Sequence, residues 1–572
     1  MLIRDRENLR FQFYDVVKRG HVLLIVGNDV DALCAATILT KLFACDDVPF
    51  SIATVSGWEA LERTIDEHAD QETSIVLLNC GVNQDLDFLL HKNQEETSRN
   101  QKIYVIDSRR PICLENVYNQ EQVVVLLDAE EESSLNIPTA EEIYPPDSDD
   151  ESDDEVDEND ENRPNRFETL QKKILKQEVR KKWERNRNNL MWNYYEKTWH
   201  SMASSVRMLE LAAALNRVSS EHMWVAAVGL NSQWTDRLIS TEMYTSICID
   251  RMRPFIYRFS PKNTPKADDV LRISFEKDLP LAMYSHWSLY QAMMVNELFA
   301  CRTKNWTQRG DAEVKHLLAG LGLTLNETKQ KYEAMTTERR KEVFNTLEQD
   351  MKSTFASFIA HLGYCSRITS ADLARALAVK LETPAALSLT ERFTNAKEIL
   401  LPFLEPSGDF LSMRKAFDSY KGSLEVVWTM VSNAVNQSEI LPTGPFYLFS
   451  SSRELDSDLL ESRHFLYNFC HFLLKAFAVS GRGRGRKPLI VSFPLTGERR
   501  GYHLVSGIMP LDTVYEDSIN KCLIGRVFKE VSRKNGMQEA LKLDHFDENI
   551  IQLRSSDRSR FFDLLQTVMG ST

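Results

Sequence analysis

The first 130 residues alternate uninterrupted apolar runs with stretches of helical periodicity. The apolar runs are rich in Val, Ile and Leu, and they cover residues 21–27, 50–57, 74–80, 102–107 and 122–128. Strands have this composition when both of their faces are buried, as in a parallel sheet covered by helices. The pattern therefore predicts a doubly wound α/β domain over residues 1–130.

The pattern changes after residue 130. Residues 131–165 contain an acidic run and are predicted to form a disordered linker, and residues 166–240 predict helices that complete the first domain. Residues 241–440 predict an all-helical insertion between the two α/β parts. Residues 441–572 return to alternating strands and helices, which indicates a smaller C-terminal α/β domain.

The negative charge of the chain is concentrated in its linker. The formal charge is −14 over 572 residues, and the stretch 145–162 carries eleven carboxylates and no cation, so the remainder is near −3. Such a run repels itself and buries no apolar surface. Ser148 and Ser152 lie among acids, as acid-directed kinases prefer, whereas the simpler interpretation is a solvated linker without a specific partner.

A basic stretch follows the linker. Between Arg163 and Arg187 there are ten cations and three glutamates, with no glycine and one proline, which favours a helix after Pro164. The basic face suits nucleic acid, an acidic partner or a nuclear import receptor. Pairs such as Glu178–Lys182 are equally consistent with a solvated helix face.

The cysteines and the hydropathy of the chain indicate in which cellular compartment the protein is expected. Nine cysteines occur without CxxC spacing, and no uncharged apolar run is long enough to form a membrane-spanning helix. The first residues are charged and lack the apolar core of a signal peptide. We therefore expect a reducing compartment, the cytosol or the nucleus, and no membrane partner.

Polar side chains stand where three of the predicted strands end. Asp29 and Asp31 follow the first run, Asn79 ends the third and Asp107 ends the fourth. The carboxyl ends of parallel strands form one edge, so these side chains are expected to converge. A divalent metal is the usual reason for clustered aspartates, although aspartates after strands also commonly cap helices.

A second basic feature is the sequence GRGRGRKP at 481–488. Arg482, Arg484 and Arg486 alternate with glycine and Lys487 follows them, a spacing similar to that of peptide hooks in the DNA minor groove. The alternative interpretation is a flexible basic surface loop without a specific ligand. Both interpretations place these residues on the surface.

Several motifs together resemble the DHH phosphoesterases, the superfamily of the RecJ exonuclease. They are GNDVDALCAATIL, VSGWEAL, LLNCG, VIDSRRP and WVAAVGLNSQW, with HFDENIIQLRSSDRSRFFDLL near the end. The closer resemblance, over essentially the whole chain, is to the eukaryotic branch of this superfamily that acts in replication initiation.

The resemblance to active members of the superfamily implies a two-manganese site, but this sequence lacks several of the residues that would bind the metals. Asp29 and Asp31 match its first loop and Asp107 matches the first residue of Asp-His-His, but Ser108 and Arg109 replace both histidines. Asn79 stands where another aspartate is expected, and GLNSQ lacks the further carboxylate. A fixed cation at Arg109 opposes a second metal. We therefore predict no metal, no cofactor and a degenerate catalytic centre.

The remaining aspartates then have an architectural explanation. Asp29 and Asp31 are expected to cap a helix or to pair with Arg109 or Arg110. The resemblance implies a nuclear, non-catalytic scaffold of the replicative helicase that joins the MCM ring and the GINS complex, with possible contacts to a replicative polymerase and loading factors.

A further role and two alternatives follow from the same resemblance. Weak binding of single-stranded DNA is predicted, with Arg109, Arg110 and the basic loop as candidate contacts. The rival hypothesis is a manganese-dependent, RecJ-like exonuclease or phosphodiesterase. A purely structural adaptor that never touches DNA also fits the sequence.

Overall fold

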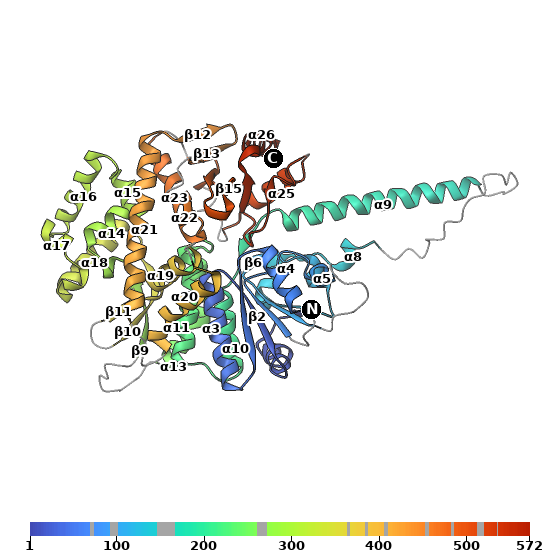
Figure 1. Ribbon diagram of the computed structural model, residues 1–572, viewed down its shortest axis with the longest axis horizontal. Coiled ribbons are helices and arrows are strands. Elements are labelled where there is room, and N and C mark those ends of the chain that lie inside the picture. Colours follow the sequence, from blue (N-terminus) through green and yellow to red (C-terminus); the bar gives the residue numbers. More distant parts are fainter. Residues whose placement is uncertain are drawn as a thin grey trace.

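The architecture was analysed in a computed structural model (Figure 1). It describes residues 1–68, 74–91, 101–145, 166–259, 271–362, 366–383, 387–404, 410–451, 457–481, 485–511, 520–534 and 536–571. The acidic run at 147–161 and residues Arg482 and Arg484 lie outside these ranges, so the prediction of a disordered linker remains a prediction there. Within them, no helix combines the length and the apolar character that crossing a membrane requires.

The first part of the chain is built on a six-stranded sheet. All of its strands are parallel, in the order β1-β7-β5-β4-β2-β3. They are β1 (Leu2–Ile3), β2 (Val22–Gly27), β3 (Phe50–Val55), β4 (Ser74–Leu78), β5 (Ile103–Ile106) and β7 (Val123–Leu126). The predicted parallel sheet is confirmed.

Helices cover both faces of this sheet. Along β2, Leu24 and Val26 contribute to one core, whereas Leu23 and Ile25 contribute to the other, because successive side chains point to opposite faces. The first core includes α3 (Val30–Cys45), α10 (Ser204–Ala214) and α11 (Ser220–Thr235), and the second includes α4 (Trp58–Glu67) and α5 (Leu86–His91). Residues 224–234 thus return to the first domain, as the sequence predicted.

The start of the predicted linker is folded. Helices α7 (Ala129–Leu135) and α8 (Ala140–Ile143) occupy residues that were assigned to a disordered segment beginning at 131. Leu135 and Ile143 are buried, and the Glu142 carboxylate accepts the Thr139 amide at 2.9 Å at the start of α8. The prediction of disorder from residue 131 was wrong because this segment still supplies apolar side chains that can be buried. The uninterrupted acidic run begins only after Pro146.

The basic stretch forms α9 (Arg166–Tyr195), which leaves the body of the protein as a single helix (Figure 1). Thirty residues at 1.5 Å each give a length of about 45 Å. Its C-terminal end is anchored: the Tyr194 hydroxyl donates to the Ile112 carbonyl at 3.0 Å, and the Tyr195 hydroxyl accepts the Leu114 amide at 2.9 Å. The predicted helix is confirmed.

The middle of the chain is mainly but not wholly helical. A three-stranded antiparallel sheet of β9 (Leu271–Asp278), β10 (Phe355–Leu362) and β11 (Ser366–Thr369) corrects the prediction of an all-helical insertion. About 75 residues separate β9 from β10, so β9 had no visible partner in local sequence, whereas β10 and β11 form a local hairpin that the helical prediction missed. Helices of this region include α14 (Leu289–Val295), α15 (Glu297–Thr303), α16 (Gln308–Gly320), α18 (Thr337–Met351), α19 (Ser370–Glu382), α20 (Leu389–Leu404) and α21 (Phe410–Asn436).

The C-terminal part is the predicted second α/β unit. Its six-stranded mixed sheet has the order β12-β13-β14-β15-β17-β16. The strands are β12 (Ile440–Thr443), β13 (Phe446–Ser450), β14 (Leu489–Pro494), β15 (Tyr502–Ile508), β16 (Leu541–Lys542) and β17 (Ile550–Arg554). The main helices are α23 (Arg463–Val479), α25 (Ile524–Ser532) and α26 (Arg558–Ser571).

Candidate functional site

The polar side chains at the strand ends do converge. Asp29 and Asp31 follow β2, Asn79 follows β4 and Asp107 follows β5, and these three strands are neighbours in the sheet. All four side chains are buried. Asn79 adopts a left-handed conformation (φ 49°), and its carbonyl oxygen lies 2.5 Å from where a Cβ on Gly27 would stand. Glycine at 27 therefore lets the two strand ends approach.

The Asn79 amide links the two aspartates of the first loop. Its Nδ2 donates to Asp29 Oδ1 at 3.0 Å and to Asp31 Oδ2 at 2.9 Å. Asp29 also caps α3, because its Oδ1 accepts the Ala32 amide at 2.8 Å. Helix capping by Asp29, one of the two expected architectural roles, is confirmed.

Arg109 lies between two carboxylates. Its Nη2 is 3.3 Å from Asp29 Oδ2, its Nη1 is 3.2 Å from Asp107 Oδ1, and Nη1 also donates to the Asn79 carbonyl at 2.5 Å. The predicted pairing with Arg109 is thus present for Asp29. Ser108 is buried beside it and donates its amide to Asn79 Oδ1 at 3.3 Å.

The neighbouring Arg110 points elsewhere. Arg109 and Arg110 form the short strand β6 (Arg109–Arg110), which pairs with β8 (Trp199–His200), so their side chains project to opposite sides. Arg110 pairs with Glu131 at 2.5 Å and not with either aspartate. The alternative pairing of the aspartates with Arg110 is therefore wrong.

Two serines complete the cluster, and sequence reasoning missed them. At the start of α10, the Ser204 and Ser205 amides donate to Asp31 at 2.8 and 3.0 Å, and the Ser205 hydroxyl donates at 2.6 Å. A Cβ on Gly229 of α11 would lie 2.8 Å from Asp31 Oδ1. Nothing in local sequence indicates these contacts, which join segments more than 170 residues apart.

Burial dominates the electrostatics of the cluster. Removal from water raises the pKa of Asp31, and the nearby charge of Asp29 raises it further, whereas hydrogen bonds from Ser205 and Asn79 oppose the shift. Burial also raises the pKa of Asp107, against the opposing charge of Arg109. Each carboxylate that remains ionised here depends on its donors.

These residues do not fit a two-manganese centre. Among the described residues, no group of three or more His, Cys, Asp and Glu side chains is arranged to hold a metal. The carboxylate oxygens instead accept hydrogen bonds from an amide, a guanidinium and two serines. A hard divalent cation needs these lone pairs and is repelled by a fixed positive charge.

The C-terminal unit covers the cluster with the segment 544–549. Phe546 packs edge-on against Trp58 at 5.1 Å between ring centroids, and the Arg109 guanidinium lies 5.7 Å from the centre of the Phe546 ring. Asp544 accepts the Glu59 amide at 2.8 Å, and Asn83 donates to Glu548 at 2.9 Å. The two α/β units are therefore in direct contact above the strand ends.

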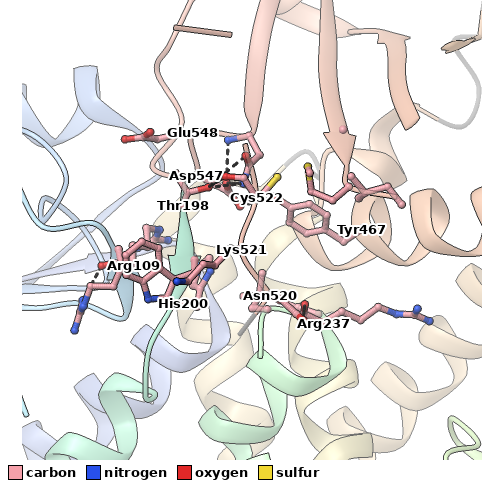
Figure 2. Close-up of a pocket in the computed structure, with 18 of the residues that line it drawn as sticks. Arg109, Thr198, His200, Arg237, Tyr467, Asn520, Lys521, Cys522, Asp547 and Glu548 are labelled. Carbon is pink, nitrogen blue, oxygen red and sulfur yellow. Dashed lines mark hydrogen bonds between the residues drawn. The ribbon is translucent and has the colours of Figure 1, made fainter. Parts of the chain in front are cut away.

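A pocket remains beside this contact, with about 780 Å³ of empty space, part of it open to solvent. Figure 2 shows residues of both units around it, including His200 and Lys521. Burial lowers the pKa of His200 to about 3, so the imidazole is neutral at physiological pH. The Lys521 ammonium lies 5.2 Å from the centre of the Trp199 ring.

Among the described residues, the predicted DNA contacts differ in their exposure. Arg109 and Arg110 are buried and held by carboxylates, so a phosphate would have to displace those partners. Arg486 is exposed, and Lys487 donates to the Gly444 carbonyl. Arg482 and Arg484 are outside the described part of the chain.

Comparison with known proteins identifies relatives along the whole chain. The profile of the family described as CDC45 matches residues 22–173 and 139–410. The human Cell division control protein 45 homolog is 30% identical over 584 residues, with 98% of this chain and 99% of the relative covered. Cell division control protein 45 of Saccharomyces cerevisiae is 21% identical, with 95% of each covered. The crystal structure of CDC45 from Entamoeba histolytica has the same fold, with a TM-score of 0.69 at 16% identity over all of both chains.

Proposed function

This chain belongs to the CDC45 family, and we propose that it is a non-catalytic scaffold subunit of the replicative helicase in the nucleus. Family membership supports a role in DNA replication. Within that role, the chain would hold the MCM ring and the GINS complex together, and a replicative polymerase and loading factors are further candidate partners. It has no GxxxxGK[ST] loop, so ATP hydrolysis would belong to MCM.

One observation supports the non-catalytic assignment above all others. The Arg109 guanidinium contacts Asp29 and Asp107, where the active members of the related superfamily imply metal. The Asn79 amide bridges Asp29 Oδ1 and Asp31 Oδ2. A hydrolase that relies on two metal ions to generate hydroxide would have neither ion held here.

The scaffold proposal predicts separable contacts with its two partners. The helical middle is the proposed docking surface for MCM, and the sheet edges are proposed for GINS. Leu325 is 46% exposed in the middle region and Leu441 is 57% exposed on the edge strand β12. Leu325→Glu is expected to weaken MCM binding about tenfold, and Leu441→Glu is expected to do the same to GINS binding.

Purified partners and the full chain suffice to measure both affinities. Each variant is the control for the other, because both place a carboxylate on an exposed leucine. If both variants weakened binding to the same partner, the assignment of separate surfaces to MCM and GINS would be wrong. Failure of the native chain to bind either partner would contradict the scaffold proposal.

An assay for DNA cleavage tests the rival enzyme hypothesis. End-labelled single-stranded DNA is incubated with the chain and manganese, beside an Asp29→Ala/Asp31→Ala variant. We expect intact DNA in both samples, because no group of three or more ligating side chains among the described residues is arranged to hold a metal. Cleavage by the native chain that the variant loses would show that the aspartates hold a working metal.

We propose that single-stranded DNA binds weakly to the basic loop at 481–488 rather than to the cleft between the two α/β units. Arg486 is exposed there, whereas the two arginines beside the cleft are buried. Phosphate contacts release counter-ions, so this affinity should fall steeply with salt.

A further inference from the structure

Helix α9 projects away from the body of the protein, although it carries apolar side chains (Figure 1). Its base is fixed by Tyr194 and by Trp192, whose ring centre lies 4.3 Å from the Arg526 guanidinium. Toward its N-terminal end, Leu175 is 60% exposed and Val179 is 65% exposed. Helix α9 is therefore anchored at its C-terminal end, and it carries exposed apolar side chains at Leu175 and Val179 in the part that projects from the body (Figure 1).

The exposed residues continue the face that is packed at the base. Steps of three, four or seven residues return to nearly the same side of a helix. One arc of about 100° contains all of the following side chains, here called the α9 stripe: Leu175, Val179, Trp183, Leu190 and Tyr194. Tyr194 is buried and Leu190 is half-buried, whereas Val179 and Leu175 are exposed. The contact surface thus extends beyond the part that this chain itself covers.

Leaving this stripe in water is unfavourable. Covering an exposed Leu or Val side chain removes apolar surface from water, which is favourable. A helix in a protein gains most of its stability from packing its amphipathic face against a neighbouring surface. Both considerations favour an external partner for the α9 stripe.

Basic side chains border the stripe on both sides. Lys182 and Arg185 lie along one border, and Arg180 and Arg187 lie along the other. Between residues 174 and 195 there are six basic and two acidic side chains, and one acid, Glu184, pairs with Arg180. In paired helices, the charges that flank the apolar seam select a partner with opposite charges.

From this arrangement we propose that the α9 stripe binds an acidic amphipathic helix of a partner protein, which packs lengthwise against α9. The apolar centre distinguishes this partner from nucleic acid, since a phosphate backbone would leave Leu175 and Val179 in water. The inference does not depend on MCM or GINS and extends the proposed function.

A synthetic helix tests this surface directly. The probe is a fluorescent peptide with leucines at i, i+4 spacing flanked by glutamates, titrated into the full chain and followed by anisotropy. Leu175→Glu/Val179→Glu is expected to weaken binding at least about tenfold. Ile174→Glu is the matched control, because Ile174 is 50% exposed on the same helix but lies outside the stripe. It should change the affinity less than about twofold.

Three further measurements separate the possible occupants. A peptide with the sequence of residues 145–162, which is acidic but has no apolar stripe, should bind far more weakly than the probe. Lys182→Glu/Arg185→Glu should weaken probe binding and flatten its salt dependence. A single-stranded oligonucleotide should fail to displace the probe.

Each opposite result overturns the proposal. The absence of saturable probe binding, or equal losses in the stripe variant and Ile174→Glu, would show that the stripe is not a docking site. Equal affinity for the 145–162 peptide would assign the surface to the acidic run of this chain. Displacement by the oligonucleotide would assign it to nucleic acid.

Discussion

Replacing Arg109 with methionine is expected to lower the free energy of unfolding by about 3–5 kcal/mol. Methionine fills much of the volume but removes the cation that lies between Asp29 and Asp107. Both carboxylates are buried, and the change would remove the guanidinium that pairs with each of them. Thermal or urea denaturation of the full chain measures the effect.

Arg180→Met is the matched control for this measurement. Arg180 also pairs with a glutamate, but its side chain is 80% exposed on α9, so its removal should change stability by less than about 0.5 kcal/mol. Arg109→Lys should fall between the two, because lysine keeps the charge but cannot reach both carboxylates in a fork. If Arg109→Met unfolded at the same temperature or urea concentration as the native chain, the stability of the buried cluster would not depend on this cation.

Restoring an aspartate at position 79 is expected to destabilise the protein by about 2–4 kcal/mol. The Asn79 amide donates to Asp29 and Asp31, and an isosteric carboxylate would replace both hydrogen bonds by repulsion. Asn79→Asp keeps the shape of the side chain, so a change in melting temperature reports charge and hydrogen bonding. An unchanged melting temperature would contradict the bridging role of the amide.

The same variant has a defined pH dependence. Burial between two carboxylates raises the folded-state pKa of the introduced carboxyl above its unfolded value. Protonation therefore stabilises the folded variant, and its deficit relative to the native chain should be smaller near pH 5 than near pH 8. A deficit that grows as the pH falls would contradict this assignment.

Manganese provides a further test of the Asn79→Asp variant. We expect millimolar manganese to leave its melting temperature unchanged, since Arg109 still lies among the carboxylates. A rise in melting temperature with manganese, absent from the native chain, would show that a single substitution rebuilds a metal site.

Much of the parallel sheet could be predicted because its strands are long apolar runs. The run at 22–27 is hydrophobic on both faces, and the rule that ligands gather at strand ends then placed Asp29 and Asn79 together. The sheet of β9, β10 and β11 was missed because β9 pairs with a strand about 75 residues away and all three strands lie within a mainly helical region. Phe546 was recognised as part of a motif, but its position over Arg109 depends on how two domains pack.

The sequence by itself determined which chemical groups are available at the strand ends. Asn79, Ser108 and Arg109 remove metal ligands whatever the fold, because an amide is a weak ligand and a guanidinium is always charged. Only the tertiary structure decided where those groups point. Pairing of β6 with β8 sends Arg109 toward the aspartates and Arg110 toward Glu131, because adjacent residues of a strand face opposite sides. Neighbours in sequence thus acquire different partners, and a cation read as a DNA contact is buried within the protein.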